Sequence, residues 1–202
     1  MIENSRSSSM TSNVKAFLKI KILERNVIQL GDYLLNSGEK SNVYFNFGKF
    51  NDSKALTELG FIFWTTMKQL DYLPEVVFGC ATKGITLALA ASSYAWNFEN
   101  HNLEFAYDRK IIKQHGEGGD YVGAYIQGKS VLIIDDVLTS GKAISRSIDI
   151  VKKYTNDIRL MVMLRRDPTV TEVMGYPVTA VLELEDIAKR SPSGIFYPNE
   201  NF

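Results

Sequence analysis

The sequence predicts an α/β fold in which a mostly parallel central sheet is flanked by helices. After residue 70, short apolar segments such as 74–80 and 130–135 alternate with segments of helical pattern and length. This alternation is typical of a parallel sheet that is covered by helices on both faces. The chain has 202 residues, of which 45% are hydrophobic and 23% charged. It is therefore long enough to bury a core, and we expect one domain over residues 11–202.

The first fifty residues predict a lead-in, a helix and a hairpin. Residues 1–10 are serine-rich, and we expect a flexible N-terminus there. Residues 11–26 begin with Thr, Ser and Asn and then show apolar positions at helical spacing, which predicts an amphipathic helix. Residues 27–35 and 42–47 are rich in β-branched and aromatic side chains on either side of a turn-like Asn-Ser-Gly, which predicts a β-hairpin.

The remaining elements follow from apolar runs and capping residues. A helix begins at an N-cap, Asp52 or Ser53, and continues through Leu70. We then expect the core sheet, within about 51–190, to contain strands at 74–80, 103–108, 121–127, 130–135 and 158–164. Helices at 83–96 and 142–154 should alternate with these strands, and a last strand within 179–190 should pass into a short helix. The tail, 191–202, looks irregular.

Composition excludes several functional classes. The formal net charge is zero, which gives no overall attraction to nucleic acid or to an anionic membrane, so we expect neither as a partner. A single cysteine, Cys80, cannot form an intrachain disulfide, and two histidines offer little for a zinc site. No segment resembles a membrane span or a signal peptide. These features predict a cytoplasmic protein.

Residues 109–123, RKIIKQHGEGGDYVG, fit neither the strand nor the helix pattern. Four glycines make regular structure unfavourable there and predict a mobile loop. The same stretch gathers four basic or imidazole side chains: Arg109, Lys110, Lys113 and His115. A charge run alone is usually a solvated turn, so these residues become candidates only together with an anion site elsewhere.

Residues 131–145, VLIIDDVLTSGKAIS, predict such an anion site. An apolar strand leads into Asp135 and Asp136, and small residues at 139–143 precede a helix. In open α/β sheets, ligands bind at the carboxyl ends of the strands, where amides at a helix start can bind a phosphate. The carboxylates would repel phosphate, so we expect them to accept hydrogen bonds from sugar hydroxyls or to meet a divalent cation. The alternative without a ligand is a solvated strand end followed by Thr139 or Ser140 as the N-cap of the helix.

A second candidate cation lies at the same sheet edge. In FGCATKGI, residues 78–85, a buried strand ends in small residues, and Lys83 stands just before the next helix. Because this strand and the strand ending at Asp135 are both expected in the parallel sheet, Lys83 should lie near Asp135. Cys80, in the same segment, is expected to be buried filler rather than a nucleophile.

The strand, the DDVLTSG string and the helix after it together resemble the signature of type I phosphoribosyltransferases, which bind 5-phosphoribosyl-1-diphosphate (PRPP). The loop string RKxxKxHGEGG, with LLNSGEKSNVYFNFGKF and FGCATKGI, is similar to the orotate phosphoribosyltransferase family, and the resemblance covers roughly residues 28–166. It implies the type I phosphoribosyltransferase fold with a small N-terminal hood subdomain near residues 11–50. It also implies transfer of the phosphoribosyl group of PRPP to orotate, giving orotidine 5'-monophosphate and diphosphate in de novo pyrimidine synthesis.

The resemblance assigns roles residue by residue. It implies catalytic roles for Lys113, His115, Asp135 and Asp136. PRPP would contact Thr82, Lys83, Arg109, Lys110, Lys113, His115, Asp135, Asp136, Val137, Leu138, Thr139, Ser140, Gly141, Lys142 and Ala143. Orotate would contact Tyr44, Phe45, Thr139 and Arg166, with Arg166 suited to its carboxylate. The implied cofactor is Mg2+, held mainly through the substrate with Asp135 and Asp136 as candidate ligands. The implied assembly is a homodimer in which the mobile loop, 109–120, is shared across the interface.

Two alternatives remain at this point. The PRPP motif is shared by the whole superfamily, so the acceptor could be another base. A noncatalytic PRPP-sensing regulator would also keep the motif. Three positions depart from the family pattern: Asn36 and Asn42 replace a common lysine and proline, and Thr82 replaces an aromatic residue.

Overall fold

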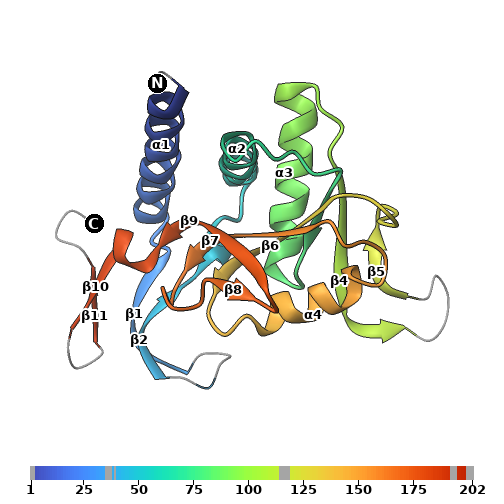
Figure 1. The fold of residues 1–202 in the computed structure, drawn as a ribbon. Coiled ribbons are helices and arrows are strands. Elements are labelled where there is room, and N and C mark those ends of the chain that lie inside the picture. The colour runs from blue at the N-terminus through green and yellow to red at the C-terminus, as the bar shows by residue number, and fades with distance from the viewer. Residues whose placement is uncertain (1–2, 35–37, 39, 114–118, 192–194, 199–202) are drawn as a thin grey trace.

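The computed structural model describes residues 3–34, 38, 40–113, 119–191 and 195–198. Its centre is a seven-stranded sheet of order β5-β4-β3-β6-β7-β9-β8 (Figure 1). The bounds are β3 Val76–Gly79, β4 Glu104–Lys113, β5 Gly119–Gly123, β6 Val131–Leu138, β7 Ile158–Arg165, β8 Glu172–Val173 and β9 Tyr176–Glu183. The five inner strands are parallel, and β5 and β8 are antiparallel edges. The predicted α/β class with a mostly parallel sheet is confirmed.

Four helices flank the sheet: α1 Glu3–Glu24, α2 Ser53–Gln69, α3 Lys83–Glu99 and α4 Lys142–Val151. Side chains alternate along β6, so each face of the strand joins a different core. Leu132 and Ile134 pack in the cluster that includes α1, α2 and α3. Val131 and Ile133 pack in the cluster with α4. Because β6 is buried on both faces, it reads as a continuous apolar run, which made it easy to predict.

The expected N-terminal hairpin consists of β1 Ile28–Leu34 and β2 Lys40–Phe45, paired antiparallel and separate from the main sheet. A one-turn 3-10 helix, η1 Phe47–Lys49, connects it to α2. The predicted N-cap of α2 is Asp52, whose carboxylate accepts a hydrogen bond of 2.7 Å from the Ala55 amide. The hairpin stands beside the carboxyl edge of the sheet (Figure 1).

The helix predicted for 11–26 begins earlier than expected, at Glu3 inside the serine-rich segment 1–10, and ends at Glu24; the flexibility of the N-terminus stays a prediction. Two predictions of irregular structure were wrong. The short 3-10 helix η2 Leu184–Asp186 follows β9, as expected for 179–190, but β10 Ala188–Arg190 then pairs with β11 Phe196–Pro198 in the tail. This pairing gives the backbone of 188–190 and 196–198 hydrogen-bond partners, a tertiary effect that local composition does not reveal.

The second error concerns the segment 109–123. Strand β4 continues through Lys113, and β5 begins at Gly119 and ends at Gly123 rather than at residue 127. At Gly123, φ is +110°, and a Cβ would lie 2.5 Å from the carbonyl oxygen of Phe105. Glycine therefore permits the close approach of β5 to β4 instead of preventing regular structure. Residues 114–118 lie outside the described residues.

Within the part of the chain that the structure describes, none of the helices is long and apolar enough to cross a bilayer.

Candidate functional site

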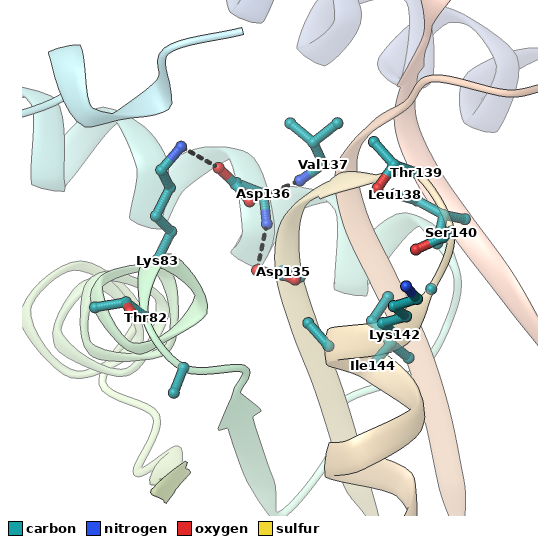
Figure 2. Close-up of a pocket in the computed structure, with 13 residues that line it drawn as sticks. Thr82, Lys83, Asp135, Asp136, Val137, Leu138, Thr139, Ser140, Lys142 and Ile144 are labelled. Atoms are coloured by element: carbon teal, nitrogen blue, oxygen red, sulfur yellow. Dashed lines mark hydrogen bonds and ion pairs between the residues drawn. The ribbon is translucent and has the colours of Figure 1, made fainter. Parts of the chain in front are cut away.

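Strand β6 carries Asp135 and Asp136 to the carboxyl edge of the sheet. The strand continues to Leu138, so the two side chains point to opposite faces, as adjacent residues of a strand do. The Asp136 amide donates to Asp135 Oδ1 at 3.0 Å, and the Val137 amide donates to Asp136 Oδ1 at 2.9 Å (Figure 2). Both residues are buried. The two carboxylates therefore have different surroundings and cannot form a symmetric dyad.

Asp136 faces α3, where it meets the predicted Lys83. Lys83 is the first residue of α3, and its Nζ lies 3.0 Å from Asp136 Oδ2 (Figure 2). The same Nζ lies 5.6 Å from the centre of the Tyr44 ring. Partial burial tends to lower the pKa of Lys83, but the charge of Asp136 and hydrogen bonding to it outweigh burial, so this pKa lies above its ordinary value. Lys83 is therefore a fixed ammonium group in the site.

Asp135 points to the α4 face of the sheet. Burial and then the nearby charge of Asp136 raise the pKa of the Asp135 carboxyl well above its ordinary value. Cys80 lies on the same side, is fully buried, and accepts a hydrogen bond of 3.2 Å from Ser147 Oγ. Burial raises the pKa of the Cys80 thiol as well, which fits the expected role as a packing residue.

A turn after β6 forms the first pocket. Gly141, with φ of +73°, is the N-cap of α4, so the alternative that Thr139 or Ser140 caps this helix is wrong. Glycine has no side chain to bond the first amides of the helix, which stay available to a ligand. The pocket has a volume of about 390 Å³, and we call it the turn pocket (Figure 2). Its lining consists of Ala81, Thr82, Lys83, Asp135, Asp136, Val137, Leu138, Thr139, Ser140, Gly141, Lys142, Ala143 and Ile144.

A second pocket of about 450 Å³ lies between the hairpin and the ends of β6 and β7, and we call it the hairpin pocket. It is lined by Gln29, Tyr33, Leu34, Tyr44, Phe45, Lys83, Asp136, Val137, Thr139 and Arg166. Four of these residues, Lys83, Asp136, Val137 and Thr139, also line the turn pocket. The two pockets are therefore adjoining halves of one groove, with the Lys83–Asp136 ion pair at their junction.

Arg166 connects the two sides of the hairpin pocket. It follows β7 and is buried, and its amide donates to the Leu138 carbonyl at 3.0 Å. Its guanidinium donates to Ser41 Oγ at 2.6 Å and to the Val43 carbonyl at 3.2 Å. Arg166 is therefore a buried residue that is hydrogen-bonded to the hairpin, not an exposed surface side chain. The structure places Tyr44, Phe45, Thr139 and Arg166 in one pocket, although Phe45 is itself buried.

The predicted basic cluster is described only in part. Arg109 lies on β4 and lines neither pocket. The backbones of Lys110 and Lys113 belong to β4, but their side chains lie outside the description, as does the whole of His115. Asn36 also lies outside the described residues. The roles of these residues stay predictions.

Sequence reasoning missed several residues in and around the groove. Gln29 and Tyr33 line the hairpin pocket, and Ser41 binds Arg166 without lining it; all three come from the hairpin, whose fold against Arg166 has no local signal. Asp108 was also missed, although it ends a predicted strand at the same sheet edge as Asp135. That shared position was the signal that could have identified it.

The groove fits Mg2+ only as an ion held largely by the substrate. The described residues contain no group of three or more acidic, histidine or cysteine side chains that could hold a metal. Asp135 and Asp136 nevertheless offer carboxylate oxygens, the ligands that this ion prefers, and magnesium commonly keeps waters and substrate phosphates as its other ligands. Asp135 and Asp136 are therefore the candidate carboxylate ligands that the described groove offers to an ion held largely by the substrate.

Comparisons with known proteins agree with this geometry. The model of the phosphoribosyl transferase domain matches residues 50–192. The orotate phosphoribosyltransferase of Schizosaccharomyces pombe is 35% identical over 188 residues, covering 87% of each chain. That of Marinobacter nauticus is 37% identical over 178 residues, covering 82% of each. The crystal structure of the Francisella tularensis orotate phosphoribosyltransferase, 30% identical, superposes with a TM-score of 0.66 over 81% of this chain and 84% of that one.

These matches extend well beyond the motifs around Asp135 and the 109–123 segment, since they cover most of the chain at 35–37% identity. The domain match begins at residue 50, after the hairpin, whereas the matches to these two relatives cover 87% and 82% of the chain. The chain belongs to the orotate phosphoribosyltransferase family of phosphoribosyltransferases.

Proposed function

We propose that this groove transfers the phosphoribosyl group of PRPP to orotate, giving orotidine 5'-monophosphate and diphosphate in pyrimidine synthesis. One observation carries the proposal: a phosphate-type pocket and a pocket containing a buried arginine share the Lys83–Asp136 pair at their junction. A donor and an acid acceptor bound in the two pockets would meet at that junction. Relatives that are 35% and 37% identical over most of this chain are orotate phosphoribosyltransferases.

The donor fits the turn pocket. The amides at the start of α4 and the positive end of its dipole suit the 5-phosphate of PRPP, and the residues from Thr139 to Ala143 surround that position. Asp135 and Asp136 then accept hydrogen bonds from the ribose hydroxyls. Thr82 and Lys83, on the opposite wall, face the diphosphate.

The acceptor fits the hairpin pocket. Tyr44 and Phe45 supply aromatic surface for a planar ring, and Arg166 supplies a guanidinium suited to the orotate carboxylate. Thr139 lines both pockets and so can contact the base as well as the donor.

The reaction develops positive charge on the ribosyl ring and negative charge on the departing diphosphate. Lys83 stabilises the leaving group because its ammonium is already held at the junction before the transition state forms. A bound magnesium ion would supply further positive charge to the diphosphate. The cationic residues Arg109, Lys110, Lys113 and His115 would add to this charge when their segment closes over the donor and excludes water.

The family resemblance implies a homodimer in which the loop 109–120 of each subunit completes the partner's groove. The proposed reaction takes place in the cytoplasm, where a protein with a single buried cysteine needs no disulfide for stability.

A spectrophotometric assay tests the proposal. Protein, magnesium, PRPP and orotate together should consume the ultraviolet absorbance of orotate, and a panel of purine and pyrimidine bases should give no comparable turnover. Absence of orotate consumption, while calorimetry shows PRPP binding, would favour the noncatalytic sensor. Faster turnover of a purine would favour the other alternative.

A further inference from the structure

We propose that Asp108 is a positioning residue which, together with Arg146, fixes the separation of the two walls of the turn pocket. This inference rests on the proposed function, because it assigns the donor PRPP to that pocket. Neither residue lines the pocket, so both would act through the backbone that does.

Asp108 lies on β4 directly after Tyr107, the last residue of that strand to pair with β3, and both oxygens of its buried carboxylate are hydrogen-bonded. Its side chain is fully buried, and Oδ1 accepts the Ala81 amide at 2.5 Å. Oδ2 accepts Arg146 Nε at 2.7 Å and lies 2.6 Å from Arg146 Nη2. A buried carboxylate is stabilised only when its oxygens are bonded, and here both oxygens have partners.

The Ala81 amide belongs to one wall of the pocket. Ala81, Thr82 and Lys83 line it in succession, so the amide held by Asp108 is two residues from the ammonium that we assign to the diphosphate. On its other side, this segment is pressed against β6: a Cβ on Gly84 would lie 2.5 Å from the Ile134 carbonyl oxygen. The segment is therefore fixed between β6 and the Asp108 carboxylate.

Arg146 belongs to the opposite wall. It lies on α4, whose first residues, Lys142 to Ile144, line the pocket across from Thr82. Part of the Arg146 side chain is exposed, whereas Asp108 is not. The Asp108–Arg146 pair thus connects the lysine-bearing segment to the phosphate-binding helix, a link of a kind that keeps substrate-binding groups in register.

Kinetic constants for each substrate and direct measurements of PRPP binding test whether the Asp108–Arg146 pair positions the walls of the turn pocket. We expect Asp108→Ala to raise the KM and the Kd for PRPP by about tenfold, the effect of losing a hydrogen bond that orients a charged group, and to change the KM for orotate by less than about twofold. Asp108→Asn keeps an oxygen for the Ala81 amide and should restore most of the PRPP affinity. Arg146→Ala should raise the PRPP constants, and the double variant should add little to Asp108→Ala.

Glu104→Ala is the matched control, since Glu104 begins the same strand and pairs with Lys129 at 2.7 Å. It should leave both KM values unchanged. The inference is overturned if folded Asp108→Ala and Arg146→Ala both bind PRPP as the wild type does. It is also overturned if Asp108→Ala lowers the melting temperature and raises the KM values for PRPP and orotate equally. Calorimetry with PRPP reports on the pair even if orotate is not the acceptor, so the two proposals fail separately.

Discussion

The turn pocket and the hairpin pocket adjoin, but they are built in different ways. The turn pocket is mostly one continuous strand, turn and helix start, completed by the segment before α3. The hairpin pocket joins β1 and β2 to the end of β7 through Arg166, whose partners Val43 and Ser41 are 123 and 125 residues away in sequence. From this difference we expect phosphate recognition to depend on backbone geometry and acceptor recognition to depend on single side chains. Variants can separate these two modes.

The largest effect is expected from Lys83→Ala, because Lys83 lines both pockets. Losing a fixed charge that faces the departing diphosphate should lower kcat/KM by about 10²- to 10³-fold. Steady-state kinetics with each substrate varied in turn would measure the loss. Lys142→Ala removes an ammonium that lines only the turn pocket and should weaken PRPP binding with a much smaller change in kcat. Equal effects from the two lysines would contradict the special position of Lys83.

Arg166→Ala should distinguish the roles of the two pockets in binding orotate and PRPP. We expect the KM for orotate to rise by about 10- to 100-fold, since a charged hydrogen bond to the substrate is lost, while the KM for PRPP changes little. Arg165→Ala is the matched control: the neighbouring side chain donates to the Val178 carbonyl at 2.5 Å and lies outside both pockets. A comparable rise in the KM for PRPP would mean that the pockets are not independent.

Asp135→Asn should show that the buried, charged carboxylate of Asp135 lowers the stability of the fold at neutral pH. The pKa of Asp135 is raised in the fold, first by burial and then by Asp136. The native state therefore binds this proton more tightly than the unfolded chain, and stability falls as pH rises from the unfolded pKa, about 3.9, through the raised folded value. The variant should melt at a higher temperature than the wild type at neutral pH, by about 2–4 °C for each kcal/mol regained.

This gain in melting temperature should shrink as pH falls toward the unfolded pKa, and melting curves from acid to neutral pH would measure it. The activity of the variant should decrease, because a carboxylate that accepts hydrogen bonds from the ribose hydroxyls is lost. A wild type more stable than Asp135→Asn at neutral pH would show that the fold stabilises the charged form instead.

The same contrast explains what the sequence could predict. The residues from Asp135 to Ala143 form a local pattern of strand, turn and helix start, so their place at the sheet edge followed from periodicity and glycine alone. The hairpin itself was also predicted, because its strands and turn are local. Its contact with Arg166 was not, since Ser41 and Arg166 meet only through the tertiary fold. For Tyr44, Phe45 and Arg166, family resemblance supplied what local physics could not.

The errors have the same origin. Glycines in 109–123 indicated a loop, but Gly123 allows β5 to approach β4 closely, which only the partner strand reveals. Similarly, β10 and β11 are short strands stabilised by each other. Asp108 looked like any strand-end carboxylate until its bonds to Ala81 and Arg146 were known.

Ser41→Ala should give the smallest effect and is the finest test of the hairpin pocket. The Ser41 hydroxyl accepts Arg166 Nη2 at 2.6 Å and also donates to the Val43 carbonyl at 2.8 Å. Without it, Arg166 is less firmly oriented, and we expect the KM for orotate to rise by about threefold to tenfold, as for the loss of one hydrogen bond. Ser92→Ala removes another hydroxyl bonded to a backbone carbonyl, that of Leu103, far from both pockets, and should leave this KM unchanged. If Ser41→Ala matched Ser92→Ala, Arg166 would be held by the rest of the pocket, and acceptor recognition would depend on the pocket's overall packing as much as on single side chains.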